Sequence, residues 1–259
     1  MNQHPRQPLR AFPVYDILGI PVVRLEWEEA LSTMRWMIRD RVFTRISFLN
    51  AHNANVAYTD AEFADALRRF LVLPDGVGVD IAARLLYGAA FPANLNGTDF
   101  IPALLTSTEE PLTVALLGAK HPNAEAAAAA FAAIAPQHRY AVIHDGFFSR
   151  EDEPAILAEI AALRPDVLLV AMGVPRQEFW IDHHITSGHC TLPFAVGALL
   201  DFMSGAVPRA PSRIRRLRLE WLFRLALEPA RLWRRYVVGN PLFLARVIRQ
   251  KLGGRKPAA

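Results

Sequence analysis

The chain has 259 residues, of which 52% are hydrophobic and 21% charged. This length allows one large or two small domains with a sizeable core, and the composition excludes a wholly disordered protein. The single cysteine, Cys190, excludes a disulfide scaffold and a zinc site of several thiolates. We expect no signal peptide, because residues 1–10 are polar and contain Pro with no apolar core behind them. We expect no membrane-spanning helix, because charges interrupt every apolar run far short of the ~20 residues that a span needs.

The charge is divided unevenly along the chain. The net charge is +4, but residues 206–259 contain fourteen Lys or Arg and two Glu, so this segment carries +12 and residues 1–205 carry −8. A strongly basic segment joined to an acidic body predicts a negatively charged partner for that segment.

Short β-rich runs alternate with helical patterns through residues 1–205. Most of these runs are continuously apolar, which is typical of parallel strands buried on both faces. Strands are expected at 45–49, 70–73, 112–117, 140–144, 166–172 and 191–196, and helices at about 53–69, 77–87, 98–107, 122–134, 150–163, 175–187 and 197–204. The alternation predicts an α/β catalytic domain over 1–205, with a Rossmann-like, mainly parallel sheet, helices on both faces and ligands at the carboxyl ends of the strands.

Residues 206–259 have no strand pattern and predict a basic, amphipathic helical appendage. Helical pieces rich in Leu, Trp and Arg are interrupted at Glu228-Pro229 and again at Gly239-Asn240-Pro241. In the piece 212–227 the apolar residues recur at helical spacing, and arginines lie off that stripe.

Polar side chains follow the first of the expected strands. Asn50, His52 and Asn53 offer many hydrogen-bond donors and acceptors without net charge, which suits a hydroxyl-rich ligand. Because Asn is also a preferred N-cap, capping of the next helix remains an alternative role for each Asn.

The next expected strand leads into Pro74-Asp75-Gly76. A carboxylate at a strand end can act as a general base when partial desolvation raises its pKa. Pro-Asp-Gly is equally a common turn sequence, so Asp75 in isolation leaves both interpretations open.

Two further strand ends carry glycine. After 166–172 the chain passes through Gly173 into a helix that begins near Gln177 and Glu178, where backbone N–H groups can hold a phosphate, although Gln and Glu there also serve ordinary capping. Gly118, after 112–117, allows a nucleotide to approach the backbone closely.

The motifs that are absent narrow the chemistry. The sequence has no G-x-G-x-x-G, Walker A or G-x-S-x-G motif, and no Asp-x-Asp that would hold a metal on a nucleotide diphosphate. His183, His184 and His189 lack a convincing ligand set, so we interpret them as surface residues. We therefore expect a metal-independent reaction that uses one carboxylate, neutral polar groups and arginines.

Taken in order, the motifs resemble those of the WecB/TagA/CpsF glycosyltransferases, glycosyltransferase family 26. The resemblance runs from about Tyr15 to Arg235, nearly the whole chain. It is carried by 50–56, LPDGVG at 73–78, NGTD at 96–99, MGVPRQE at 172–178, Val196-Gly197 with Asp201 and Gly205, RAP at 209–211, and LEWLFRL at 219–225 with Glu228-Pro229 and Arg231.

The resemblance implies an inverting, metal-independent transfer from a UDP-sugar to a sugar on undecaprenyl diphosphate, with no cofactor. Asp75 matches the family's base, and Asn50 and His52 stand where the family commonly has Thr and Asn that contact substrate sugars. Gln177 matches an active-site Gln, and Asn94 stands where the family often has an Arg. Arg224, Arg231 and Arg234 match appendage arginines that face the diphosphate. The other residues expected to bind substrate are Asn53, Gly76, Asn96, Gly118, Glu178 and Arg209.

The expected enzyme lies on the cytoplasmic face of the cell membrane as a peripheral protein, held by the appendage, and works in exopolysaccharide or other cell-envelope polysaccharide synthesis. N-acetylmannosamine, its uronic acid, glucose and glucuronic acid all remain open as the transferred sugar, and a homo-oligomer is also left open. The competing hypothesis is a non-enzymatic α/β binding module with a basic tail for nucleic acid or anionic lipid. Because the tail interleaves arginines with Leu, Trp, Phe and Val, the pattern favours lipid or protein as its partner, and we expect no nucleic acid.

Overall fold

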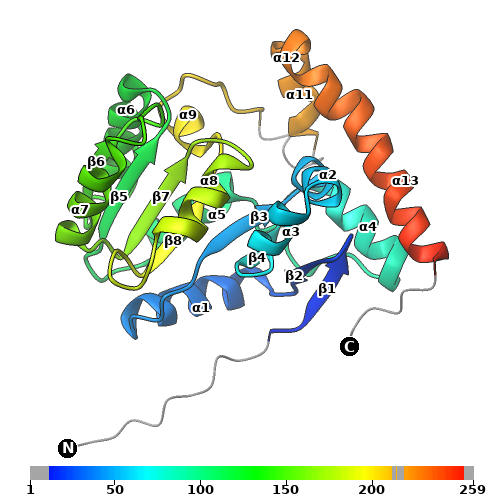
Figure 1. Ribbon diagram of the computed structural model, residues 1–259, viewed down its shortest axis with the longest axis horizontal. Helices are drawn as coiled ribbons and strands as arrows, with labels where there is room; N and C mark the ends of the chain where they lie inside the picture. Colours follow the sequence, from blue (N-terminus) through cyan, green and yellow to red (C-terminus); the bar gives the residue numbers. More distant parts are fainter. Residues whose placement is uncertain (1–11, 212–213, 215–218, 254–259) are drawn as a thin grey trace, which may run out of the picture.

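The computed structural model describes residues 12–211, 214 and 219–253. Its centre is an eight-stranded sheet in the order β1-β2-β4-β3-β8-β7-β5-β6 (Figure 1). β1 and β2 pair antiparallel, and all other neighbouring strands pair parallel. The strands are β1 (Val14–Ile17), β2 (Ile20–Val23), β3 (Ile46–Leu49), β4 (Leu71–Pro74), β5 (Thr113–Gly118), β6 (Arg139–His144), β7 (Val167–Ala171) and β8 (Leu192–Ala195).

Helices cover both faces of the sheet, as the alternating pattern predicts. The helices up to residue 205 are α1 (Trp27–Arg39), α2 (Ala51–Thr59), α3 (Ala61–Leu67), α4 (Val77–Tyr87), α5 (Gly97–Ser107), α6 (His121–Ile134), α7 (Glu153–Leu163), α8 (Arg176–His184) and α9 (Leu199–Met203). Residues of α2, α3, α4, α7 and α8 form one buried apolar cluster with the sheet. Residues of α1, α5, α6 and α9 form the other. The expected fold class is therefore confirmed.

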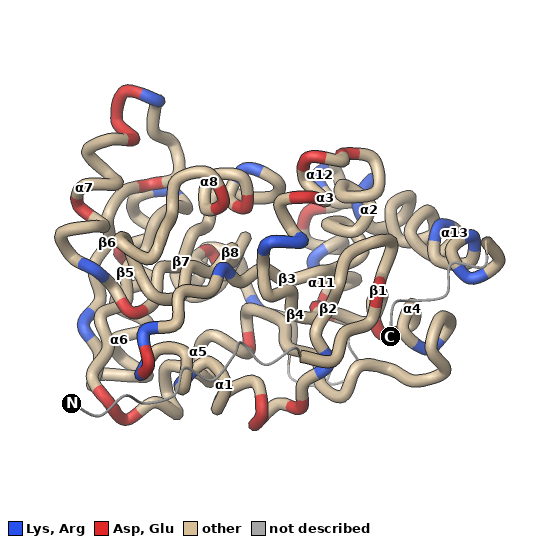
Figure 2. The backbone as a smooth tube through the Cα atoms, turned by 60° about the horizontal axis from the view of Figure 1, so that its bottom comes forward, with Lys and Arg blue, Asp and Glu red and all other residues tan. Residues whose placement is uncertain are grey.

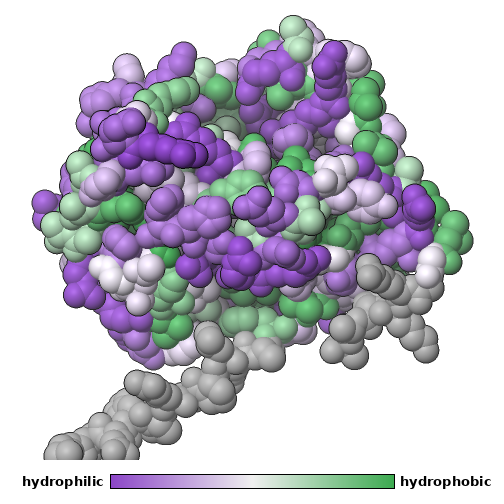
Figure 3. All heavy atoms as spheres, viewed as in Figure 1, coloured by the Kyte–Doolittle hydropathy of each residue, from purple (hydrophilic) through white to green (hydrophobic). Residues whose placement is uncertain are grey.

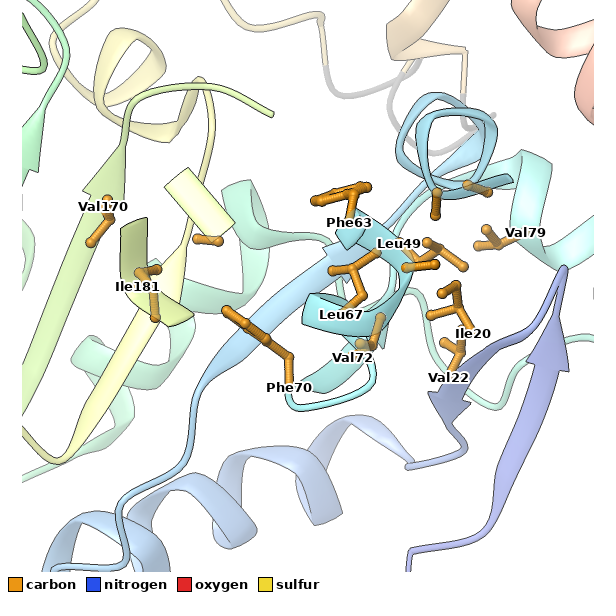
Figure 4. Packing of buried hydrophobic residues seen from close by; sticks show 14 of the residues in the cluster. Ile20, Val22, Leu49, Phe63, Leu67, Phe70, Val72, Val79, Val170 and Ile181 are labelled. Atoms are coloured by element: carbon orange, nitrogen blue, oxygen red, sulfur yellow. The ribbon is translucent and has the colours of Figure 1, made fainter. Parts of the chain in front are cut away.

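The core explains why the central strands are almost entirely apolar; the exception is Ser47 of β3, which is itself buried. Every residue of β3, β7 and β8 is buried, so no position on these strands needs a polar side chain to meet solvent. Figure 4 shows one side of this packing, in which Phe63 and Leu67 of α3 lie over the sheet near Leu49 and Val72.

Two features near the amino end differ from the expected elements. The hairpin β1–β2 and helix α1 were not among them; the hairpin turns through Leu18 and Gly19, both at positive φ, without the Asn-Gly pair that usually signals such a turn. The expected helix 53–69 is two helices, because the Asp60 side chain accepts a hydrogen bond from the Phe63 N–H at 3.0 Å and starts α3.

The C-terminal segment is helical where it is described. It contains α11 (Glu220–Leu227), α12 (Pro229–Trp233), the π-helix η1 (Arg234–Val238) and α13 (Gly239–Leu252). The interruption at Glu228-Pro229 is confirmed. The one at Gly239-Asn240-Pro241 is wrong, because η1 passes directly into α13 with helical backbone angles at Val238 and Gly239. Residues 212, 213 and 215–218 of the expected piece 212–227, which include Arg213, Arg215, Arg216 and Arg218, lie outside the described residues.

Helix α13 packs against the α/β body beside α2 and α4 (Figure 1). Phe243 and Val247 are fully buried in this contact. The Asn55 amide donates to the Gly239 carbonyl at 2.7 Å, and Arg246 Nη1 donates to Asn55 Oδ1 at 2.9 Å. Figure 2 shows that Lys and Arg recur along the rest of this helix. In the part of the chain that is described, no helix has the length and apolarity required to cross a bilayer.

Candidate active site

A cavity of about 640 Å³ lies at the carboxyl ends of β3 and β4, between the α/β body and the C-terminal helices. The first turn of α2, the turn after β4 and residues 94–99 line it from the body, and α11, η1 and α13 line it from the other side. The residues predicted from the sequence that line it are Asn50, His52, Asp75, Gly76, Asn94, Asn96 and Arg224. The fold thus brings together groups that are far apart in the sequence.

Asp75 follows β4 directly and presents its carboxylate to the cavity. Its backbone N–H donates to the Leu49 carbonyl at 2.9 Å, which ties the ends of β3 and β4 together. The Asn50 Nδ2 donates to Asp75 Oδ2 at 3.1 Å. Burial raises the pKa of Asp75, while the Asn50 hydrogen bond and the charges of Arg235 and Arg224 oppose that rise. A carboxylate with a raised pKa in a cavity is suited to accept a proton.

Asn50 and Asn53 have different roles in the structure. The Asn50 Oδ1 accepts hydrogen bonds from the N–H groups of His52 and Asn53, so Asn50 is the N-cap of α2 as well as a cavity residue. Asn53 is only 4% exposed, and its amide donates to the Phe48 carbonyl at 2.8 Å. Asn53 does not line the cavity, so its expected contact with substrate stays a prediction.

His52 projects from the first turn of α2 into the same cavity. Burial lowers its pKa to about 4, and the nearby charge of Arg235 acts in the same direction. The imidazole is therefore neutral near pH 7 and offers one donor and one acceptor to a polar ligand.

Two further asparagines belong to the cavity wall on the side of the α/β body. Asn94 Oδ1 accepts a hydrogen bond from the Gly76 N–H at 2.7 Å, and Gly76 has a φ of +91°, which favours glycine. Asn96 is the N-cap of α5: its Oδ1 accepts from the Asp99 N–H, and its Nδ2 donates to Asp99 Oδ2 at 3.0 Å. Both residues line the cavity while they hold its wall in place.

Gln177 and Glu178 form a separate, buried group at the ends of β7 and β8. Gln177 is 2% exposed, and its Oε1 accepts hydrogen bonds from the N–H groups of Gly173 and Gly197. Glu178 is fully buried; Ser47 and Gln177 both donate to its Oε1, and burial raises its pKa to about 7. Neither residue lines the cavity, so their expected binding of substrate stays a prediction.

Gly118, at the end of β5, is required by strand packing. A Cβ at this position would lie 2.4 Å from the Ala171 carbonyl oxygen of β7, and its φ is +114°. No larger residue fits between β5 and β7 here. Gly118 lies outside the cavity lining, and its expected contact with a nucleotide is likewise untested.

The predicted arginines divide into two groups. Arg224 of α11 lines the cavity, whereas Arg231 forms an ion pair with Glu228 and Arg234 lies over the Trp233 ring; neither Arg231 nor Arg234 lines the cavity. Arg209 also lies outside the cavity lining, but it links two residues that line the cavity. Its Nη2 donates to Asp99 Oδ1 at 2.9 Å, and its Nε donates to Glu220 Oε1 at 3.1 Å. For these three arginines, direct contact with substrate stays a prediction.

Arg235 lines the cavity and was not predicted from the sequence. Burial lowers its pKa, and the Arg224 charge adds to this effect, while Tyr236 and Asp75 oppose it. The Nε atoms of Arg224 and Arg235 are buried and have no hydrogen-bond partner among the described residues. Two neighbouring guanidinium groups with unused donors favour an anionic ligand.

Comparison with known proteins agrees with this arrangement. The profile of the glycosyl transferase WecG/TagA/CpsF family matches residues 15–257. The chain belongs to this family. The protein is accordingly a glycosyltransferase, as the motif resemblance predicted, and the non-enzymatic binding module is set aside.

Curated members of the family are similar to this glycosyltransferase over most of its length. A protein of Bacillus subtilis (strain 168) named N-acetylglucosaminyldiphosphoundecaprenol N-acetyl-beta-D-mannosaminyltransferase is 30% identical over 216 residues, 83% of this chain and 82% of its own. Proteins of the same name from Staphylococcus aureus (strain NCTC 8325) and Bacillus spizizenii (strain W23) are 34% identical over 244 residues and 32% identical over 188 residues. These matches cover 91% and 72% of this chain, and 92% and 71% of theirs.

The residues that sequence reasoning missed come from the C-terminal helices of the glycosyltransferase. Trp221, Arg235 and Tyr236 line the cavity together with Glu220. From the charge pattern, Arg235 is only one of many arginines in the C-terminal segment. Whether Arg234 or Arg235 faces the cavity depends on the helical phase, which the sequence does not show. The π-helix η1 changes that phase, because each of its turns holds more residues than an α-helical turn.

Proposed function

We propose that the protein transfers an N-acetylmannosamine-type sugar from its UDP conjugate to a sugar carried on undecaprenyl diphosphate, with inversion and without a metal ion. The observation that carries this proposal is the position of Asp75. Of the carboxylates that line the cavity, Asp99 and Glu220 are both paired with Arg209, whereas Asp75 accepts one amide hydrogen bond and forms no ion pair with any described residue. The names of the relatives, which describe transfer of N-acetylmannosamine to a diphosphoundecaprenol acceptor, support the choice of substrates.

Asp75 acts as the general base in this proposal. Its carboxylate takes the proton from the acceptor hydroxyl while that oxygen forms a bond to the anomeric carbon of the donor sugar. The bond between that carbon and the UDP oxygen breaks, and the electron pair leaves with UDP. A single displacement of this kind inverts the anomeric carbon, since attack and departure occur on opposite faces. The raised pKa of Asp75 increases its affinity for the proton during the transfer.

Arg224 and Arg235 offset negative charge in the cavity. A guanidinium remains charged at neutral pH and matches the oxygens of a phosphate with two donors. Both groups lie in the same cavity as Asp75 with their Nε atoms unpaired, and they are suited to hold a diphosphate as charge develops on it. Their placement supports a reaction in which arginines do the work that a metal ion does in other transferases.

We place the nucleotide of the donor near the carboxyl ends of β5 and β7. β5 and β7 are neighbours in the sheet, and the chain leaves them in opposite directions: from β5 it crosses to β6 on one side, and from β7 it crosses to β8 on the other. Open α/β sheets bind ligands at the point where the connections diverge in this way. The end of β5 lacks a side chain at Gly118, and α8 begins directly after β7. In this arrangement Gln177 holds the loops after β7 and β8 through its hydrogen bonds with the N–H groups of Gly173 and Gly197.

The C-terminal helices supply a surface suited to the cytoplasmic membrane face. Leu222, Val237, Leu242 and Ile248 are each at least 43% exposed. Figure 3 shows apolar and polar residues side by side along the edge that α13 forms. Because each Lys or Arg near an anionic bilayer contributes about 1 kcal/mol, part of the +12 charge of residues 206–259 is enough for reversible binding.

The test is a UDP-release assay with the full chain. UDP-N-acetylmannosamine is compared with UDP-N-acetylmannosaminuronic acid, UDP-glucose and UDP-glucuronic acid. Each donor is assayed with and without an N-acetylglucosaminyl diphosphoundecaprenol analogue, and each assay is repeated with a chelator. We expect UDP release from the first donor only with the acceptor, unchanged by chelator and reduced at least a hundredfold in Asp75→Asn.

Preference for another donor would reassign the sugar while the reaction type stands. Loss of activity in chelator, or near-normal turnover of Asp75→Asn with its fold intact by circular dichroism, would overturn the proposed mechanism.

A further inference from the structure

The turn that carries Asp75 is held from two sides by amide side chains. From the end of β3, Asn50 Nδ2 donates to Asp75 Oδ2 at 3.1 Å. From the loop before α5, Asn94 Oδ1 accepts from the Gly76 N–H at 2.7 Å. One contact holds the carboxylate and the other holds the backbone of the next residue, so the carboxylate has a defined direction.

Asn50 itself has little freedom to turn away. Its Oδ1 accepts the N–H groups of His52 and Asn53 at 3.0 and 3.1 Å, which fixes the amide plane by the start of α2. With the oxygen committed to the helix N-terminus, the Nδ2 of the same amide is directed at Asp75. A single amide therefore couples the helix cap to the carboxylate.

We propose that Asn50 is a positioning residue for Asp75, whose amide holds the carboxylate oriented and ionised for proton transfer. This proposal rests on the proposed function, in which Asp75 is the base. It differs from the expectation that Asn50 contacts a substrate sugar, because Oδ1 accepts two backbone hydrogen bonds and one Nδ2 hydrogen is donated to Asp75.

Other charged groups face Asp75 and set the background for any pH dependence. Arg235 of η1 and Arg224 of α11 favour the ionised carboxylate, and Glu220 of α11 disfavours it. His52 of α2 and Asp99 of α5 line the same cavity. The Asn50 hydrogen bond is the largest of the effects that oppose burial, so its removal should be visible against this background.

The test uses Asn50→Asp and Asn50→Ser in the full chain. Both replacements keep an oxygen that can cap α2, and Asp caps as well as Asn. Both remove the amide donor, and Asn50→Asp also places a second carboxylate beside Asp75, which raises the pKa of the pair. We expect the acid limb of the kcat/KM profile to move to higher pH by at least one unit in Asn50→Asp and by less in Asn50→Ser, with thermal midpoints close to wild type.

Asp60→Ala serves as the control for loss of a helix cap. Asp60 caps α3 through the Phe63 N–H, and it does not line the cavity, so this variant should lose stability and keep the wild-type acid limb. A raised KM with an unmoved acid limb in Asn50→Asp would overturn the proposal in favour of direct contact with substrate. Asp75→Asn is measured in the same series. If Asp75→Asn remains active, the assignment of Asp75 as the base fails. If Asp75→Asn is inactive and the acid limb of Asn50→Asp is unmoved, only the positioning role of Asn50 fails.

Discussion

Arg209 and Asp99 form an ion pair at 2.9 Å that connects the C-terminal segment to the start of α5. The same guanidinium donates to the Thr98 carbonyl at 3.0 Å and pairs with Glu220, the first residue of α11. One arginine thus bridges two carboxylates of the cavity wall and ties α11 to the body. This geometry gives Arg209 a role in closing the cavity that does not require contact with substrate.

Arg209→Ala is therefore expected to release α11. Glu220 and Asp99 would both lose this cation, and two carboxylates near the cavity repel an anionic substrate. We expect a fall in kcat/KM of at least tenfold and faster hydrogen exchange in 220–227, with the exchange of β3 and β4 unchanged. Unchanged exchange in α11 would show that packing alone holds this helix.

Arg235→Gln should impair transfer more than Arg234→Gln. Arg235 lines the cavity and lies near Asp75, whereas Arg234 lies over the Trp233 ring outside the cavity lining. Loss of one positioned donor to developing charge costs on the order of a hundredfold in turnover. The measurement is the steady-state turnover of the two variants. Arg249→Gln on α13 is the control for a general loss of positive charge. An equal or larger effect of Arg234→Gln would contradict the orientation of η1.

Strand positions in the body could be predicted because the central strands are buried on both faces. An apolar run such as 166–172 has few alternatives when Gly and polar residues bound it, and β7 lies within one or two residues of the expected limits. The hairpin β1–β2 could not be found this way, since β1 alternates solvent-accessible and buried positions and contains Asp16, and the turn carries no Asn-Gly signal.

The site could be predicted only in part, for a related reason. Asn50 and Asp75 were placed together because the carboxyl ends of parallel strands meet at one edge of the sheet, whereas Asn94 was identified only from the family resemblance. No comparable topological rule places the residues of the appendage. Which of its arginines faces the cavity depends on the helical phase and on how α13 packs against the body through Phe243. A helix break was expected at 239–241, but a π-helix passes into α13 there, and that junction determines the position of Arg235.

Phe243→Ala is expected to loosen the docking of α13. Phe243 is fully buried between α13 and the body, and the loss of a buried Phe side chain costs about 3–5 kcal/mol. We expect faster hydrogen exchange in 239–252 and reduced transfer, because α13 also lines the cavity. Leu252→Ala, at a position that is 81% exposed, is the matched control and should change neither quantity. If the two variants behave alike, α13 does not depend on this contact.

Glu178 should make the stability of the body depend on pH in a direction unusual for a carboxylate. Burial raises its pKa from 4.5 to about 7, so the native state holds the proton over a range in which the unfolded chain has released it. The stabilisation is complete below pH 4.5 and is lost as the pH rises through 7, by about 3 kcal/mol in total.

Glu178→Gln removes this titration and keeps a side-chain oxygen to accept from Ser47 and Gln177. Urea unfolding at several values between pH 5 and 8 should show the free energy of unfolding of the wild type falling relative to that of Glu178→Gln as the pH rises. Glu125→Gln, at an exposed position on α6, should leave the wild-type dependence unchanged. A constant difference between wild type and Glu178→Gln across this range would mean that Glu178 is already ionised in the folded protein at pH 5.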